Sequence, residues 1–384
     1  MDYLIHYGEL ALKGKNRIFF ENKLISNIKQ KATEEKIKVK LDRLWGRISL
    51  RCAGAKSQKL KTESLLQKTP GIAWFASSFA VNPDFFNFQQ AIKEIAQENT
   101  FSTFGIRAKI ADKKLNFQRK KIEEKLGDWV RINFQKKVDL TKPDLTFYVE
   151  ILNAKKAFIF SQKQSAPGGL PAGSNGQSLG LLSGGLDSPV AAYLMILRGL
   201  KVSFIHFHSY PQTNQASLEK VKTLAKLLNH YQPQSSLYLI PFLKIQKDFY
   251  KNCDSRFLVL LYRRAMLNIS QKLAEKEGFQ ALITGDSLGQ VASQTIENLA
   301  LQNKAVKLPI LRPLVGLDKE KIISLAKKIN SYEISIAPHQ DCCSLFVPKN
   351  PATRADLVQI EKEEAKLNLK KLTETALKNR EEIK

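Results

Sequence analysis

The sequence predicts an α/β protein in which small α+β modules precede a doubly wound parallel sheet. After residue 178, apolar strand-like runs alternate with amphipathic helical runs, the order of a sheet whose parallel strands are joined by helices. Before residue 164, the strands and helices suit an antiparallel sheet with helices on one face. The 384 residues are enough for two or three such domains.

The first module is expected to contain two strands and two helices. An apolar run at residues 3–7 predicts a strand, and residues 17–30 have helical spacing. Residues 44–52 (LWGRISLRC) alternate in character, which predicts one further strand, and residues 56–67 predict the second helix.

A second module begins near residue 71 and ends in a predicted hairpin that turns at Asn153 and Ala154. A long basic helix precedes this hairpin. The expected elements are strands at 71–81 and 104–110, helices at 88–99 and 118–134, and hairpin strands at 145–152 and 156–162.

The composition changes at residues 165–178 (SAPGGLPAGSNGQS), which are rich in Gly, Pro and Ser and indicate a domain boundary. The alternating strands and helices follow it, and a sheet of this kind has its active site at the carboxyl ends of the strands. The tail from residue 355 predicts one or two amphipathic charged helices that dock on the domain or face solvent.

The net charge of +25 makes nucleic acid the first candidate partner. Residues 1–164 carry 32 Lys and Arg against 17 Asp and Glu, so the excess is heavier there than in the remainder. A lysine-rich proteome is the alternative explanation. The sequence has no apolar run of ~20 residues and no signal peptide, so we expect a cytoplasmic protein without membrane contact.

The strongest local signal is the Gly-rich loop at residues 183–188 (SGGLDS), between an apolar strand and an amphipathic helix. Gly184 and Gly185 allow the backbone N–H groups to approach phosphate, and the hydroxyls of Ser183 and Ser188 can donate hydrogen bonds. The helix directs its positive end at the same point. Asp187 would repel phosphate without a cation, which indicates Mg²⁺. A chance Gly-rich turn is the alternative.

The loop matches the SGGxDS motif of the PP-loop ATP pyrophosphatases, and further motifs narrow the resemblance. In combination they resemble the ThiI family, the tRNA 4-thiouridine synthetases, over essentially the whole chain. These motifs are YGELALKGKNRIFFE at 7–21, VDLTKPDLTFYVEI at 138–151, GGLPAG at 168–173, TGDSLGQVASQTIENL at 284–299 and ILRPLVGLDKEKII at 310–323.

The resemblance implies a ferredoxin-like domain (1–58), a THUMP RNA-binding domain (59–164), a linker (165–177) and a PP-loop ATP pyrophosphatase domain with C-terminal helices (178–384). It implies that ATP adenylates uridine 8 of tRNA and that persulfide sulfur from a cysteine desulfurase replaces the adenylate, giving 4-thiouridine. Two alternatives stay open, a tRNA-binding protein with a non-catalytic loop and an enzyme that thiolates another tRNA base.

The resemblance also assigns site residues. Lys319 would act in adenylation, with a helix-surface lysine as the alternative, and His206 could equally be a packed strand histidine. Besides the loop residues, the family's nucleotide contacts fall on Leu181, Leu182, His206, Phe207, Arg263, Gly285 and Gln294.

Cys342 matches the family's cysteine of the PP-loop domain, and its neighbour Cys343 is interpreted as structural. Some members carry the persulfide on a C-terminal rhodanese domain, and this sequence ends at Lys384 without one. The sulfur is therefore expected on Cys342 or on a separate carrier protein. A link to thiamin synthesis and a homodimer both stay open.

For tRNA, two basic stretches are the best candidates, and contacts with RNA shape and phosphate should dominate there. A solvated charged face is the alternative for any one of their residues. The candidate residues are Lys13, Lys15, Arg17, Arg119, Lys120 and Lys121.

Overall fold

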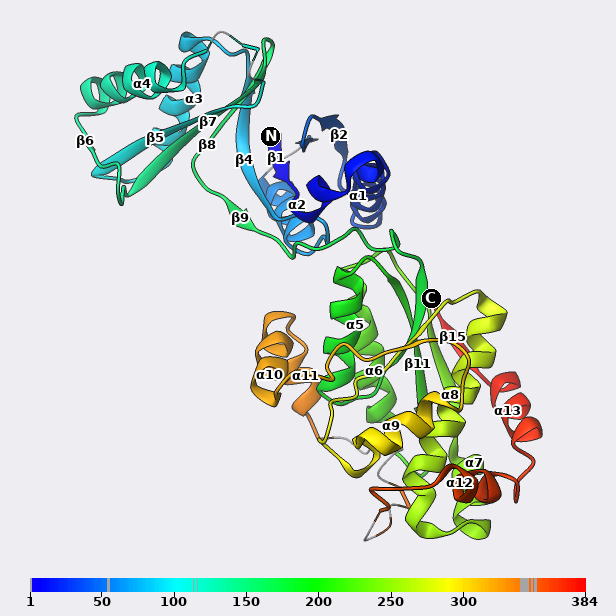
Figure 1. Ribbon diagram of the computed structural model, residues 1–384. Coiled ribbons are helices and arrows are strands. Elements are labelled where there is room, and N and C mark those ends of the chain that lie inside the picture. Colours follow the sequence, from blue (N-terminus) through cyan, green and yellow to red (C-terminus); the bar gives the residue numbers. More distant parts are fainter. Residues whose placement is uncertain are drawn as a thin grey trace. The chain divides into compact units, whose positions relative to one another are not determined.

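The computed structural model describes residues 2–384 except for 54, 55, 113, 116, 339–344, 347, 349 and 350. The chain divides into two compact units, Met1–Gly169 and Leu170–Lys384 (Figure 1). Within the described ranges, no helix is long and apolar enough to cross a membrane.

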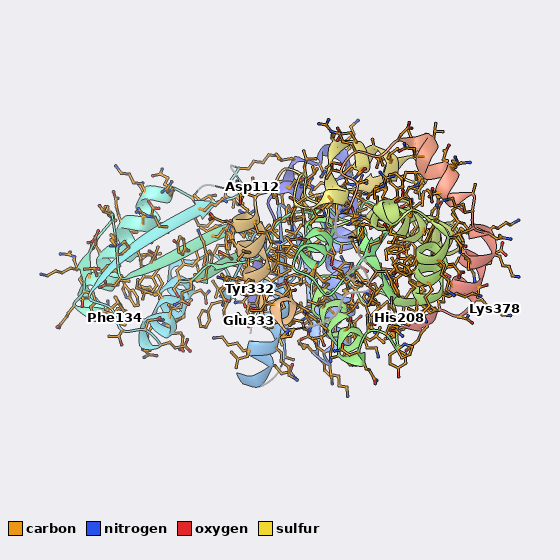
Figure 2. All side chains as sticks on the ribbon, turned by 90° about the horizontal axis from the view of Figure 1, so that it is seen from below. Asp112, Phe134, His208, Tyr332, Glu333 and Lys378 are labelled. Atoms are coloured by element: carbon orange, nitrogen blue, oxygen red, sulfur yellow. The ribbon has the colours of Figure 1, made fainter. Side chains whose placement is uncertain are left out.

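The N-terminal unit is built on one mixed sheet with the strand order β2-β3-β1-β4-β8-β7-β5-β6, and β9 pairs with β4. Its strands are β1 (Asp2–His6), β2 (Val39–Leu44), β3 (Arg47–Cys52), β4 (Trp74–Val81), β5 (Thr103–Ile110), β6 (Lys137–Val138), β7 (Leu145–Asn153), β8 (Lys156–Phe160) and β9 (Gln164–Ser165). Its α-helices are α1 (Arg17–Glu34), α2 (Lys56–Gln67), α3 (Phe85–Gln97) and α4 (Arg119–Phe134), and Phe134 is labelled in Figure 2.

Strand β4 belongs to both halves of this sheet. Residues from Trp74 to Ser78 pair antiparallel with β1, whereas residues from Phe79 to Val81 pair antiparallel with β8. The two sequence modules therefore share one continuous strand.

The predicted strand at 44–52 is confirmed only from Arg47 to Cys52, which form β3. Residues 44–52 span the end of β2, a turn and β3, so this stretch and the residues before it form an antiparallel hairpin. Gly46 adopts a φ of 72°, a left-handed conformation that favours glycine and reverses the chain. The alternating pattern predicts a single strand because it continues across this turn.

The C-terminal unit contains a six-stranded sheet with the order β14-β13-β10-β11-β12-β15. Neighbouring strands are parallel except for the antiparallel pair β12 and β15, which confirms the doubly wound parallel sheet. The strands are β10 (Gln177–Leu181), β11 (Lys201–His208), β12 (Leu237–Pro241), β13 (Leu282–Ile283), β14 (Ile310–Leu311) and β15 (Glu381–Ile383).

The helices of this unit are α5 (Asp187–Leu197), α6 (Gln215–Leu228), α7 (Leu243–Asn252), α8 (Leu258–Glu277), α9 (Ile296–Asn303), α10 (Lys319–Lys328), α11 (Tyr332–Ile336), α12 (Leu357–Glu364) and α13 (Leu369–Lys378). The tail was expected to be helical throughout. It forms α12 and α13 but then adds β15, which pairs with β12 at the sheet edge.

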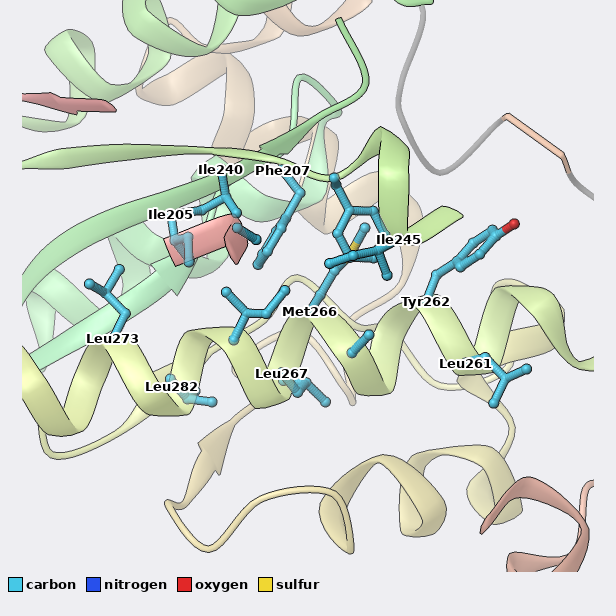
Figure 3. Packing of buried hydrophobic residues seen from close by; sticks show 14 of the residues in the cluster. Ile205, Phe207, Ile240, Ile245, Leu261, Tyr262, Met266, Leu267, Leu273 and Leu282 are labelled. Atoms are coloured by element: carbon cyan, nitrogen blue, oxygen red, sulfur yellow. The ribbon is translucent and has the colours of Figure 1, made fainter. Parts of the chain in front are cut away.

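Two hydrophobic clusters cover the two faces of this sheet. Val202 and Phe204 of β11 pack with residues of α5, α6 and α10. Ile205 and Phe207 of the same strand pack with α7 and α8. Figure 3 shows Met266 on the side of α8 that faces Ile205 and Phe207. Burial of each large apolar side chain contributes roughly 1.5–3 kcal/mol to the stability of the fold. Packing on both faces therefore fixes the position of the sheet, whose strand ends build the site.

Candidate nucleotide-binding site

The Gly-rich loop joins β10 to α5 and is closed by its own two serines. The Ser183 N–H donates to Ser188 Oγ (2.9 Å), and the Gly185 N–H donates to Ser183 Oγ (3.2 Å). The two hydroxyl oxygens lie 3.1 Å apart. Both hydroxyls thus hold the loop in shape, a use that the sequence did not suggest.

The N-terminus of α5 is available to an anion. Leu186, at the N-cap position, makes no side-chain hydrogen bond to the first turn. The first N–H groups of a helix have no partner within it, and the helix dipole adds partial positive charge at the same place. The loop and the helix start together can therefore accept phosphate.

Gly285 fits where a larger residue could not. A Cβ atom at this position would lie 2.8 Å from Ser188 N and 2.9 Å from Ser188 Cα. The end of β13 therefore packs directly on the first turn of α5, and only glycine allows this close approach.

A cavity of about 240 Å³ opens beside the loop, and the nucleotide contacts that the resemblance implies outside the loop all line it. Of the predicted loop residues, Gly184 is not part of the lining. The predicted residues in the lining are Leu181, Leu182, Ser183, Gly185, Asp187, Ser188, His206, Phe207, Arg263, Gly285 and Gln294. The structure adds further lining residues that the sequence does not predict, namely Leu186, Ile205, Met266, Leu267, Thr284, Asp286 and Gln302.

His206 is both a packed strand histidine and a lining residue. Its imidazole is buried, and its Nδ1 lies 2.8 Å from the carbonyl oxygen of Leu182, to which an Nδ1–H would donate. This contact ties the start of the loop to β11. The two interpretations of His206 are therefore compatible.

A buried carboxylate holds the polar wall of the cavity. Asp286 accepts hydrogen bonds from Arg263, from Arg312 Nε (3.1 Å), from Thr284 Oγ1 (2.7 Å) and more distantly from Gln294 Nε2 (3.4 Å). Burial opposes ionisation of Asp286, but the two arginines and the Thr284 hydroxyl outweigh it and lower its pKa. Arg263 is thus held in place by a carboxylate before any ligand arrives.

Asp187 and Lys319 meet at the mouth of the loop. Lys319 Nζ donates to Asp187 Oδ1 (2.8 Å), and Gln290 Nε2 donates to Asp187 Oδ2 (3.0 Å). Lys319 is the first residue of α10, and its side chain is about half exposed. A half-exposed cation is therefore held beside the phosphate-binding loop.

Among the described residues, no group of three or more His, Cys, Asp or Glu could hold a metal ion. Cys342 and Cys343 lie outside the described residues. Burial and Glu363 raise the pKa of the Cys253 thiol to about 11, and Cys52 is buried, which favours structural roles for both.

The chain leading towards Cys342 is anchored by a buried lysine. Helix α11, which begins at Tyr332 and Glu333 (Figure 2), ends next to α6. Lys220 Nζ on α6 donates to the carbonyl oxygens of Ser335 (2.7 Å) and Ala337 (2.8 Å). These charge-assisted bonds fix the backbone just before residue 339.

The basic candidates for tRNA contact lie in the N-terminal unit, near the starts of two helices. Arg17 begins α1, pairs with Glu21 (3.3 Å) and stacks over the exposed ring of Trp45 at 4.5 Å. Arg119 begins α4 and pairs with Glu123 (2.9 Å). Lys15, Lys120 and Lys121 are exposed, and Lys13 is half-buried.

Two site residues that the sequence did not predict, Asp286 and Gln290, fall inside the motif at 284–299, which is the only sequence feature that points to them. Within this motif, no local pattern distinguishes either residue from the other polar loop residues. Gln302 lies beyond that motif, on α9, and only its packing against the cavity identifies it.

Three sequence families match the chain. The family described as "Thiamine biosynthesis protein (ThiI)" matches residues 173–369. The family described as "ThiI ferredoxin-like domain" matches residues 2–76, and the "THUMP domain" family matches residues 83–160. A probable tRNA sulfurtransferase of Thermoanaerobacter sp. (strain X514) is 41% identical, over 96% of both chains. One of Thermus thermophilus is 40% identical, over 98% of this chain and 91% of its own length.

Two solved structures resemble the whole chain. A 4-thiouridine synthetase in complex with RNA and bound ATP has a TM-score of 0.89 and 35% identity, covering 100% of this chain and 98% of its own. PH1313 from Pyrococcus horikoshii has a TM-score of 0.68 and 23% identity, covering 86% of this chain and 99% of its own, and shows the same fold.

Proposed function

This chain belongs to the ThiI family, and from that premise we propose that it is an ATP-dependent tRNA sulfurtransferase acting in the cytoplasm. In the finer proposal, O4 of uridine 8 attacks the α-phosphate of ATP and pyrophosphate leaves. The terminal sulfur of a persulfide made by a cysteine desulfurase then attacks C4, and AMP leaves. A thiol attacks the inner sulfur and breaks the remaining S–S bond, which leaves a disulfide on the carrier and 4-thiouridine as the product.

One observation carries the proposal. The closed loop and the uncapped start of α5 border the same cavity. The Asp187–Lys319 pair lies at the mouth of this loop. This combination suits a ligand with phosphates at one end. The apolar lining from Met266, Leu267 and Phe207 suits the flat faces of a base at the other.

The residues at the mouth have distinct proposed roles. The loop N–H groups and the start of α5 hold phosphate oxygens, and Lys319, held beside them by Asp187, stabilises the negative charge that develops during transfer. Asp187 would hold Mg²⁺ together with the phosphates of the substrate, and the ion would neutralise phosphate charge there. A single carboxylate fits Mg²⁺ because this ion commonly binds one or two carboxylates plus substrate phosphates.

Cys342 remains our candidate for the sulfur-bearing residue, with a separate carrier protein as the alternative. We keep the four-part division at 1–58, 59–164, 165–177 and 178–384 as a proposal, as we do a homodimer, which sedimentation velocity would test. A contribution to thiamin synthesis is likewise proposed, because the matching family description names that pathway.

The basic N-terminal unit supports RNA as the acceptor. It carries most of the charge excess, and a solved relative is described as an RNA complex. A tRNA-binding protein with an inactive loop would have no need of the Lys319–Asp187 contact, which favours the enzyme over this second candidate.

The test combines the protein with unmodified tRNA, Mg-ATP, cysteine and a cysteine desulfurase. We expect near-ultraviolet absorbance from 4-thiouridine together with release of AMP, and loss of both when position 8 of the tRNA is changed to cytidine. Asp187→Ala should abolish AMP release, whereas Cys342→Ser should lose the thiolated product but retain pyrophosphate release. Absence of product and of AMP with the unmodified protein would refute the proposal, and thiolation at another base would refute its uridine 8 part.

A further inference from the structure

A buried carboxylate of the N-terminal unit joins the two halves of its sheet. Glu150 lies on β7 and is 3% exposed. It accepts hydrogen bonds from Nε (2.7 Å) and Nη2 of Arg47 on β3, and its Oε2 lies 3.0 Å from Nε2 of His6 on β1. Burial opposes ionisation of Glu150, but His6 and Arg47 outweigh it and lower its pKa to about 2, so the carboxylate is charged at neutral pH.

These contacts require the sheet to bend. Strands β1, β4 and β8 lie between β3 and β7 in the strand order. Neighbouring strands lie roughly 4.8 Å apart, so a flat sheet would hold β3 and β7 roughly 19 Å from each other, beyond the combined reach of an arginine and a glutamate. The halves meet along β4, which pairs with β1 from Trp74 to Ser78 and with β8 from Phe79 to Val81 (Figure 1).

Aromatic rings and a lysine add a second link between the halves. Lys163, between β8 and β9, places its Nζ 4.1 Å from the ring centre of Tyr148 on β7 and 5.0 Å from that of Trp74 on β4. The ring of Trp74 in turn stacks on His6, with ring centres 3.8 Å apart. A cation over an aromatic face is attracted to it, so Lys163 supports the bend that Glu150 holds.

The two halves carry different candidate contacts for tRNA. Lys13, Lys15 and Arg17 lie at or just before the start of α1, which packs on β2. Residues 119–121 lie at the start of α4, which packs on β5 and β6. The bend between the halves therefore sets the distance between the two basic stretches.

We propose that Glu150, Arg47 and His6 form a clasp that holds the two halves at one angle and so places both basic stretches for simultaneous contact with one tRNA. A folded RNA presents its phosphates at fixed separations. Two stretches held at a matching distance therefore bind it more tightly than two that move independently. The inference rests on the proposed function, which makes tRNA the acceptor, and it adds three positioning residues that act through the sheet.

A paired substitution removes the clasp without leaving a buried charge unpaired. Arg47→Met with Glu150→Leu replaces both charges by apolar side chains, an exchange that is often neutral for the stability of buried ion pairs. The matched control is Asp2→Leu with Arg51→Met, because Arg51 Nε donates to Asp2 Oδ1 (2.9 Å) and the two residues are direct neighbours on β1 and β3. The control pair therefore lies within the first half of the sheet.

The test uses the full chain and two readouts. Fluorophores on unnatural amino acids in place of Lys29 of α1 and Lys125 of α4, both exposed, report the distance between the halves by single-molecule energy transfer. Steady-state AMP release with unmodified tRNA, Mg-ATP, cysteine and a cysteine desulfurase gives kcat and KM. The unmodified protein and the control should show one narrow distribution of distances. The clasp variant should show a broader one, with KM for tRNA raised roughly 10-fold and with kcat and KM for ATP unchanged.

Three results would overturn the clasp: distances in the clasp variant as narrowly distributed as in the control, a KM for tRNA equal to that of the control, or a lower kcat at unchanged KM, which mere loss of folded protein would produce. Glu150→Gln supplies a second variant if the paired one does not fold, because it removes the charge and keeps the shape. If the unmodified protein releases no AMP with tRNA, the proposed function fails, and the distances still test whether Glu150 holds the bend. If AMP is released and the clasp variant matches the control, only the clasp fails.

Discussion

Replacing Gly285 by alanine tests how closely the end of β13 packs against the start of α5. The added Cβ would lie 2.8 Å from Ser188 N, 2.9 Å from Ser188 Cα and 3.0 Å from the carbonyl carbon of Asp187. Ordinary contacts begin at 3.4 Å, so the backbone would have to move by about half an ångström. These are main-chain atoms of a helix start, and a rotamer change cannot relieve the overlap.

Overpacking of this kind costs about 1–3 kcal/mol. We expect Gly285→Ala to lower the free energy of unfolding by that amount in urea titrations. ATP binding should weaken at least ~10-fold, because the displaced atoms belong to the phosphate-binding turn and 1.4 kcal/mol corresponds to a factor of ten.

Gly316→Ala is the matched control, since a Cβ there meets no atom within 4 Å. It should leave ATP binding unchanged and keep or slightly raise stability, because alanine restricts the unfolded chain. If Gly285→Ala matched Gly316→Ala in both stability and ATP affinity, the close approach of β13 to α5 would not matter in solution, and the reasoning would be wrong.

Three further predictions follow from individual contacts. Lys319→Met should slow AMP release by roughly 10²-fold to 10³-fold in single-turnover assays, because the charge that stabilises the transferring phosphate is lost. Lys321→Met, on the same helix, should leave the rate unchanged. Equal rates of AMP release in the two variants would contradict the proposed role of Lys319. Lys220→Met should lower the free energy of unfolding by about 2–3 kcal/mol, because a charged donor to two carbonyl oxygens is lost. If Lys220→Met were as stable as the control Lys226→Met, which changes an exposed lysine of the same helix, the anchoring role of Lys220 would be wrong. Burial, and then His206, lower the pKa of His208 (labelled in Figure 2) from its ordinary 6.5 to about 4, so the neutral imidazole stabilises the fold above pH 6.5. That stability should be lost progressively as the pH falls from 6.5 to 4, and denaturation midpoints of His208→Asn should show a weaker pH dependence over this window.

The phosphate loop could be predicted because its signal is local. A buried strand, two glycines and an amphipathic helix follow one another within residues 177–197, and the geometry of such a turn depends on neighbours in sequence. The alternation of strands and helices likewise predicted the parallel sheet. The hairpin at Gly46 and the edge strand β15 were missed, because pairing decides whether a short polar stretch becomes a strand.

The sequence by itself therefore determined the fold class, the phosphate loop and, through the resemblance, most residues that line the cavity. Only the tertiary structure brought Lys319 to Asp187 across 132 residues of chain, and only it joined Arg263 and Arg312 on Asp286. It also placed Gln302, from a different helix, in the lining of the cavity. The physical reason is that these contacts depend on how strand ends and helix starts pack together, and no local pattern of residues encodes those distances.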